Sequence, residues 1–237
     1  MVKSLRIRPG QIVNVCDERR QRHTIRITNI TKKTLSADIQ ETVFGPPQTP
    51  PVITLAQSVL KGEHMAWAIQ KSTELGVHII APIITERVQS RSGSRSFNAH
   101  HERWQRIALE AAQQSERWDY PTLLPSQTFS EFLERVSDTH IKLIFTEREH
   151  AKDVNGRACS LEPHMLATQN ILLAIGPEGG WSQAELQKAE MANMTKVTLG
   201  EHILRSETAA IAGLLLLQER LERFTFTTVT RDPHECE

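Results

Sequence analysis

Residues 1–44 alternate apolar and polar side chains with a period of two, which predicts short strands. Residues 11–15, 23–27 and 35–39 each place apolar side chains two positions apart, as a strand with one buried face requires. Turn-like sequences such as Pro9-Gly10 separate these segments. The pattern therefore predicts a small β-barrel or meander at the start of the chain.

The pattern changes after a proline-rich stretch at residues 46–51. Because proline fixes its own φ angle and restricts the residue before it, this stretch is predicted to be a semi-rigid linker between domains. Beyond it, helical patterns separate apolar runs at residues 52–56, 77–84, 141–145, 171–175 and 197–199. Such alternation predicts an α/β domain with a mainly parallel sheet covered by helices.

Helix boundaries are indicated by capping residues. Residues 128–131 and 182–185 both have the capping-box pattern, in which a hydroxyl and a glutamate satisfy first-turn amides reciprocally. Gly76 is a predicted C-terminal cap for a helix over residues 63–75. Further helices are predicted over residues 96–117 and 207–223. The last is apolar around most of its circumference, so we expect it to be buried, with a second subunit as one surface that would cover it.

Charge is balanced over the chain, with 28 Lys and Arg against 28 Asp and Glu, so there is no global signal for nucleic acid. Residues 1–51 carry nine basic and four acidic side chains, a net charge of +5 that leaves −5 for the remainder. A basic β-rich segment fits contact with a phosphate backbone, and it fits a solvated surface equally well.

Cysteine spacing and hydropathy argue against a cysteine-based metal site and against a membrane-spanning segment. The chain has three widely spaced cysteines and no cluster with metal-ligand spacing, so we expect free thiols and no metal. The longest apolar stretch, residues 209–217, has nine residues, far fewer than a membrane span needs. We therefore expect a soluble, cytoplasmic protein.

Two glycine-rich sequences, residues 175–180 and 199–209, each join a predicted strand to a predicted helix. Glycine permits positive φ angles and close approach of the backbone to a ligand, and amides at a helix start favour an anion or a polar ligand edge. Neither sequence has the pattern of a phosphate-binding P-loop or a dinucleotide fold. Each could be a plain structural turn, but two in succession suggest one pocket.

Two charged residues favour the functional interpretation of these turns. Glu178 is an unusual choice for a purely structural glycine turn, and capping does not explain Arg205 directly before the last helix. The Arg205 guanidinium could pair with Glu178 or Glu207, or meet a phosphate or a base. Separately, residues 91–95 (Arg-Ser-Gly-Ser-Arg) form a basic loop suited to gripping an RNA backbone.

Several short motifs occur in a characteristic order and spacing between about residues 55 and 222. They are Lys71, residues 73–77, Pro82, Glu86-Arg87, residues 110–112, Gln114-Ser115, Arg117, Pro121, residues 175–180, Glu185, Leu199-Gly200, residues 203–205 and residues 207–209. In this order they resemble the bacterial RsmE family of 16S rRNA (uracil-N3)-methyltransferases, within the SPOUT superfamily.

The resemblance implies a SPOUT-type trefoil-knotted α/β fold, with helices on both faces of a parallel sheet. It also implies S-adenosylmethionine as cofactor, bound at the subunit interface of a homodimer. The family's cofactor-binding motifs correspond here to Phe145, Thr146, Ile175, Gly176, Pro177, Gly179, Gly180, Leu199, Gly200, Ile203, Leu204 and Arg205. Among residues in these loops, Glu178 and Glu207 are candidate bases for the uracil N3 proton, and Arg205 is a candidate stabiliser of the deprotonated base.

The resemblance also divides the chain. Residues 1–45 would form a PUA-like RNA-binding β-barrel, one strand shorter than is usual in the family. Residues 46–51 would be the linker, residues 52–224 the methyltransferase domain and residues 225–237 a tail. Predicted RNA contacts are Arg6, Arg8, Arg26, Lys71, Arg87, Arg91 and Arg117.

The expected function is methylation of N3 of a specific uridine in 16S rRNA of the small ribosomal subunit, without a metal or a membrane. Two alternatives remain open at this stage. One is methylation of another RNA target, either a ribose 2′-hydroxyl or a tRNA base, because related folds serve several targets. The other is a non-catalytic RNA-binding assembly factor that keeps the fold.

Overall fold

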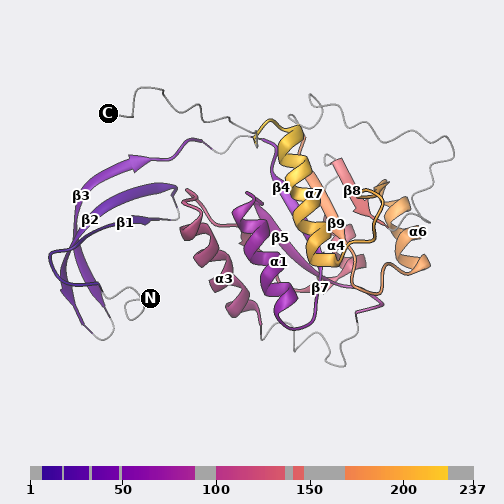
Figure 1. The fold of residues 1–237 in the computed structure, drawn as a ribbon, viewed down its shortest axis with the longest axis horizontal. Helices are drawn as coiled ribbons and strands as arrows, with labels where there is room; N and C mark the ends of the chain where they lie inside the picture. Colours follow the sequence, from indigo (N-terminus) through magenta and orange to yellow (C-terminus); the bar gives the residue numbers. More distant parts are fainter. Residues whose placement is uncertain are drawn as a thin grey trace, which may run out of the picture.

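The computed structural model describes residues 7–17, 19–31, 34–47, 50–88, 100–136, 141–146 and 169–223. Within these residues the strands form two separate sheets (Figure 1). The N-terminal sheet is antiparallel and consists of β1 (Ile12–Cys16), β2 (Gln21–Ile30) and β3 (Leu35–Phe44) in the order β1-β2-β3. The three strands predicted for this segment are confirmed, and β2 and β3 extend beyond their predicted ends.

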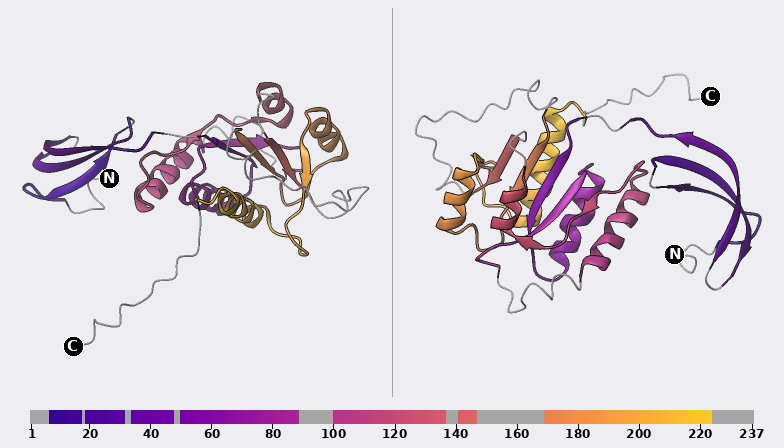
Figure 2. Two further views of the ribbon diagram at one scale, coloured as in Figure 1. Left: turned by 90° about the horizontal axis from the view of Figure 1, so that it is seen from above. Right: turned by 180° about the vertical axis from the view of Figure 1, so that it is seen from behind.

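The alternating pattern of the N-terminal segment corresponds to two faces of a real sheet. In β2, Ile25 and Ile27 are buried while Arg26 between them is exposed. The register between β2 and β3 shifts at Thr24/Ile25 and at Ile27/Asn29, and such irregularities bend a strand. The described residues form an open curved sheet (Figure 2), and its closure into a barrel stays a prediction.

The second sheet is parallel throughout. Among the described residues its strand order is β10 (Thr195–Val197), β8 (Ile141–Phe145), β9 (Ile171–Ile175), β4 (Ile53–Ser58), β5 (Ile79–Ile84) and β6 (Thr122–Leu123), and β7 (Gln127–Thr128) also pairs with β5. The predicted parallel α/β sheet is therefore confirmed. The sequence pattern missed β6 and β7, which have two residues each, and it placed β10 slightly late. The trefoil knot stays a prediction.

Helices cover both faces of this sheet (Figure 2). One face carries α1 (Glu63–Glu74), α3 (His101–Gln114) and α7 (Ser206–Arg220), and the other carries α4 (Phe129–Arg135) and α6 (Gln183–Met191). Strand β9 shows the consequence for the core. Ile171, Leu173 and Ile175 pack in the cluster under α1, α3 and α7, whereas Leu172 and Ala174 pack in the cluster under α4 and α6. A strand buried on both faces needs a continuous apolar run.

The helix ends follow the predicted caps. Thr128 and Ser182 both form complete capping boxes. Gly76 has a φ of 82°, and the Val77 N–H donates to the Ser72 carbonyl after α1, which is the Schellman geometry. The helix predicted over residues 96–117 is α3. It ends at Gln114, before the predicted end at residue 117, and residues 96–99 lie outside the described residues.

The last helix agrees only in part with its prediction. It begins at Ser206 and ends at Arg220, so it starts one residue before the predicted range and ends before residue 223. Its core side, with Ala210, Leu214 and Leu217, is buried. On the outer side, however, Leu215 is 41% exposed and Leu216 is 54% exposed. Packing within the described ranges therefore does not bury this helix completely.

The N-terminal sheet contacts the parallel sheet's domain at the corner after α3. The Arg22 guanidinium lies 4.3 Å from the centre of the Trp118 ring, and Arg20 pairs with Asp119. Gly45 approaches Trp118 so closely that a Cβ there would lie 2.9 Å from its ring. A cation–π contact and an ion pair thus join the two parts of the chain.

His78 lies just before β5 and is held in its neutral form by its surroundings. Its Nδ1 accepts a hydrogen bond of 3.0 Å from the Ile53 N–H, so this nitrogen carries no proton. Burial, followed by the nearby Arg117 guanidinium, lowers the pKa of His78 to about 4. The neutral imidazole therefore helps to fix the start of β4 against β5.

This pKa makes stability depend on pH. Between the unfolded pKa of 6.5 and the folded pKa of about 4, the unfolded chain binds the His78 proton and the folded chain does not, so the free energy of unfolding falls as the pH falls through this window. In a His78→Asn variant, the amide oxygen can still accept from Ile53 but does not titrate. Denaturant unfolding at several pH values should therefore give a flatter profile for the variant. Equal slopes for both proteins would contradict this assignment.

Candidate functional site

The carboxyl ends of three adjacent strands, β10, β8 and β9, open into one pocket of about 310 Å³. The loop after β9 and the loop after β10 form two of its walls, and Phe145 and Thr146 at the end of β8 lie between them. In parallel sheets, ligands bind at this edge, beyond the carboxyl ends of the strands. The two glycine-rich sequences therefore belong to one cavity.

The first loop is shaped by contacts that require small residues. Gly180 has a φ of 69°, and its N–H closes a turn onto the Pro177 carbonyl. A Cβ on Gly176 would lie 2.9 Å from the Trp181 indole nitrogen, which donates a 2.8 Å hydrogen bond to the Phe145 carbonyl. Gly176 is thus needed because the indole ring passes directly against the loop backbone.

The second loop is fixed to the first by a single hydroxyl. Ser206, at the start of α7, donates a hydrogen bond of 2.5 Å to the Gly176 carbonyl. Its oxygen accepts a hydrogen bond of 2.9 Å from Gln57 Nε2, and Gln57 is fully buried in β4. This chain of hydrogen bonds joins β4, the first loop and α7, so the two walls of the pocket hold a fixed separation.

The floor of the pocket combines an aromatic ring with a buried hydroxyl. Phe145 packs against α7 where Gly213 lies, and a Cβ on Gly213 would be 2.9 Å from Phe145 Cζ. Thr146 Oγ1 is buried and has no hydrogen-bond partner among the described residues. A buried polar atom without a partner is costly, and this one lies at the pocket, where a polar ligand group would satisfy it.

Eleven of the twelve residues predicted to bind the cofactor line this pocket; only Gly179 does not. The Gly179 carbonyl instead accepts a 2.9 Å hydrogen bond from Arg87. Six further residues line the pocket: Trp181 and Thr198, which the sequence patterns did not indicate, and Glu201, His202, Ser206 and Ala209 of the second glycine-rich sequence. Gln57 was not predicted either, because its only signal is a polar side chain late in an apolar strand.

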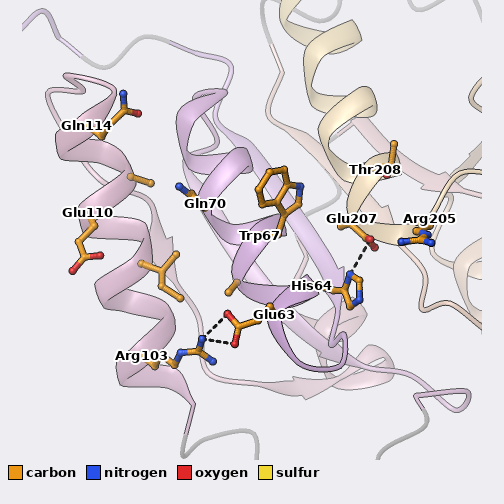
Figure 3. Close-up of a pocket in the computed structure, with 13 residues that line it drawn as sticks. Glu63, His64, Trp67, Gln70, Arg103, Glu110, Gln114, Arg205, Glu207 and Thr208 are labelled. Carbon is orange, nitrogen blue, oxygen red and sulfur yellow. Dashed lines mark hydrogen bonds and ion pairs between the residues drawn. The ribbon is translucent and has the colours of Figure 1, made fainter.

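A larger groove of about 820 Å³ adjoins the pocket, between α1, α3 and the first turn of α7 (Figure 3). Trp67, half exposed, projects into it from α1. Arg103 and Glu63 pair across its lower end at 2.8 Å. Arg205 lines both this groove and the smaller pocket, so the two cavities meet at its side chain.

The three predicted catalytic residues have different surroundings. Glu178 is exposed and lines only the smaller pocket. Glu207 is 7% exposed, lines the larger groove and meets His64 Nδ1 at 2.9 Å. Arg205 is the N-cap residue of α7, but its side chain does not cap the helix, and it forms no ion pair with any other described residue. Its guanidinium is therefore available at the junction.

The structure does not bring the predicted RNA-binding residues together. Arg8 and Arg26 are exposed on the N-terminal sheet, and Lys71 pairs with Glu74 on α1. Arg87 reaches the first glycine loop. The Arg117 guanidinium is mostly buried and donates to the Thr73 and Val77 carbonyls and to Asp119, which favours a structural role. Arg6 and Arg91 lie outside the described residues.

The described part of the chain lacks a cluster of metal-ligating side chains, a cysteine pair and a membrane-spanning helix. It contains no group of three or more His, Cys, Asp or Glu side chains placed to hold a metal ion. Cys16 is a free thiol there, and Cys159 and Cys236 lie outside the described residues. None of the helices in the described ranges has the length and hydropathy required to cross a membrane.

Comparison with known proteins agrees with this geometry. A profile of the RNA methyltransferase domain family matches residues 47–218. The ribosomal RNA small subunit methyltransferase E of Mesomycoplasma hyopneumoniae is 34% identical over 210 residues, which cover 89% of this chain and 86% of that protein. The Bacillus subtilis protein of the same name is 26% identical over 222 residues, with coverage of 94% and 87%.

Two solved structures resemble the fold closely. One is the Neisseria gonorrhoeae ribosomal RNA small subunit methyltransferase E bound to S-adenosylmethionine, with a TM-score of 0.77, 34% identity, and coverage of 92% of this chain and 86% of that one. The other is a Legionella pneumophila methyltransferase in complex with the same cofactor, with a TM-score of 0.79, 30% identity and the same coverage. The chain thus belongs to the ribosomal RNA small subunit methyltransferase E family.

Proposed function

We propose that the protein transfers a methyl group from S-adenosylmethionine to N3 of a uridine in the 16S rRNA of the small ribosomal subunit. The observation that carries this proposal is the pocket in which two glycine loops, joined through Ser206, meet at the ends of adjacent parallel strands. The names of the relatives support methylation of small-subunit rRNA, and the Neisseria and Legionella structures hold the cofactor.

The pocket suits the proposed cofactor. S-adenosylmethionine, when bound, supplies an electrophilic methyl group on a sulfonium. Leu199, Leu204 and Ile175 give the pocket apolar walls, and the unpartnered Thr146 hydroxyl offers a hydrogen bond to a polar group. Gly200 leaves open space for close approach of a ligand to the backbone, whereas the Trp181 ring already fills the corresponding space at Gly176.

The residues at the junction supply the remaining chemistry. A neutral imide nitrogen is a poor nucleophile, so a base must accept the N3 proton, and a cation must stabilise the negative charge that develops on uracil. Arg205 suits the second role because it lines both cavities and carries a positive charge. The uridine would enter through the larger groove, unstacked from its neighbours so that N3 can be reached.

The rest of the molecule would hold the RNA and a second subunit. In this proposal, residues 1–45 are a PUA-like barrel that contacts RNA through Arg8 and Arg26, and residues 52–224 are a knotted methyltransferase domain beyond the linker. Arg87 would contact RNA beside the pocket. The exposed Leu215 and Leu216 on α7 would meet a second copy of the chain. The protein would act in the cytoplasm, with its rRNA substrate.

Cofactor binding should be visible as stabilisation. At a hundredfold excess over the dissociation constant, a ligand that binds only the folded state adds about 2.7 kcal/mol to the free energy of unfolding. Thermal unfolding with S-adenosylmethionine should therefore shift upward for the wild type. Ser206→Ala should bind the cofactor about tenfold more weakly, because the Gly176 carbonyl and the buried Gln57 N–H lose their shared partner.

Ser130→Ala is the matched control, since this hydroxyl accepts a bond from Lys188 on the other face of the sheet. It should keep the wild-type affinity. A wild type with no thermal shift at saturating cofactor would exclude this cofactor. A Ser206→Ala variant with wild-type affinity would exclude the bridging role of the hydroxyl.

Arg205→Ala should slow N3-methyluridine formation about a hundredfold, as expected for the loss of one donor that stabilises developing negative charge. Mass spectrometry of nucleosides from small-subunit RNA treated with each protein measures the product. The variant should keep the wild-type unfolding temperature, because Arg205 forms no ion pair with the other described residues. Undiminished product would remove Arg205 from the mechanism.

The proposed dimer predicts a mass of twice 26.9 kDa in sedimentation experiments. Leu216→Glu places a charge on the exposed side of α7 and should yield monomers. Met191→Glu, on α6 at the opposite face of the sheet and 77% exposed, is the matched control and should stay dimeric. A wild type that sediments as a monomer at micromolar concentration would contradict the proposed interface.

A further inference from the structure

His64 and Glu207 face each other from the first turns of two helices that are far apart in the sequence. His64 lies in the first turn of α1, and Glu207 lies in the first turn of α7 (Figure 3). Nδ1 of His64 and Oε1 of Glu207 are 2.9 Å apart. An ionised carboxylate only accepts hydrogen bonds, so Nδ1 of His64 is the donor.

The two partners differ in their access to solvent. The Glu207 side chain is 9% exposed, whereas the imidazole of His64 is 50% exposed. Burying a carboxylate is costly unless it is hydrogen-bonded, and the bond from His64 meets part of that cost. The same bond fixes the orientation of the carboxylate, which would otherwise rotate about its side-chain torsions.

The position of this pair distinguishes Glu207 from Glu178. Glu207 and His64 line the larger groove, while Arg205, two residues before Glu207, lines both cavities. Glu178 lines only the cofactor pocket. The methyl group takes the place of the N3 proton, so an acceptor beside the uracil must remove that proton first, and Glu207 is the carboxylate that lines the groove through which the uracil would enter. The geometry therefore favours Glu207 as the proton acceptor.

We propose that His64 is a positioning residue for methyl transfer, which holds the Glu207 carboxylate at the junction where it accepts the N3 proton of the target uracil. This inference rests on the function proposed above. It assigns a role to His64, a residue outside the two glycine loops, and it decides between the two carboxylates of those loops.

The step balances without any further reactant. Glu207 takes the N3 proton, and the N–H electron pair left on nitrogen forms the bond to the methyl carbon. The carbon–sulfur bond breaks, and its electrons neutralise the sulfonium. Arg205 stabilises the negative charge that develops on the uracil as the proton leaves. Protonated Glu207 then returns its proton to water through the open groove.

Four variants test this assignment. Glu207→Gln removes the base and should lower kcat about a hundredfold or more. His64→Ala leaves the base unsupported and should lower kcat about tenfold, the effect of one hydrogen bond to a charged group. His64→Asn keeps an N–H donor at the Nδ position and should restore most of the rate. The double variant that combines His64→Ala with Glu207→Gln should be no slower than Glu207→Gln alone, because the two residues act as one unit.

Two further measurements separate positioning from a structural effect. The dissociation constant for S-adenosylmethionine, from calorimetry, should stay at its wild-type value in His64→Ala and His64→Asn. The unfolding temperature should fall slightly in His64→Ala, because the buried Glu207 carboxylate loses a hydrogen bond, and both variants should stay folded at the assay temperature. His100→Ala is the matched control, because His100 stacks on Trp104 and lies outside both cavities. It should keep the wild-type kcat.

The outcomes separate this inference from the proposed function. A wild type that neither binds the cofactor nor forms N3-methyluridine would overturn the proposed function itself. With an active wild type, an unchanged kcat in His64→Ala would overturn the role of His64 alone. A rate loss that is explained by weaker cofactor binding, or by unfolding of the variant at the assay temperature, would also overturn it, as would additive losses in the double variant.

Discussion

The arrangement of this site depends on the two hydrogen bonds of the Ser206 hydroxyl. It donates to the Gly176 carbonyl and accepts from the buried Gln57, so one small group sets the distance between loops that follow different strands. Ser206 is the first residue of α7, directly after the N-cap residue Arg205, and its side chain bonds the neighbouring loop and not its own helix. The start of α7, with Arg205 and Glu207 on either side of Ser206, is fixed by the same contact.

Once α7 is held there, the remaining geometry follows from the parallel sheet. Strands β10, β8 and β9 are neighbours, so their carboxyl ends lie at one edge and their loops share a cavity. Helix α7 also packs beside α1 on the same face of the sheet. This packing brings the first turns of the two helices together and forms one side of the larger groove. The smaller pocket and the larger groove thus meet at one helix start, and Arg205 lines both.

Sequence patterns were most informative where structure is local. Apolar runs, capping boxes and glycine turns predicted the large strands, the helix starts and the two loops that line the pocket, because each depends on residues near one another in the chain. Contacts over long separations left no such signal. Gln57 lies 149 positions from Ser206, and Arg117 turns inward to carbonyls at the end of α1, 40 and 44 positions away. The larger groove combines three distant helices, so no single motif could indicate it.

Gly213 has a consequence for what the pocket can admit. It lies in the middle of α7, behind Phe145, and a methyl group there would press on the ring that forms part of the pocket floor. The depth of the cavity is therefore controlled from the far side of an aromatic side chain, by a residue that a ligand never touches. Exchanging Gly213 for alanine would press the new methyl group against the Phe145 ring, and so would move the pocket floor without changing any residue that lines it.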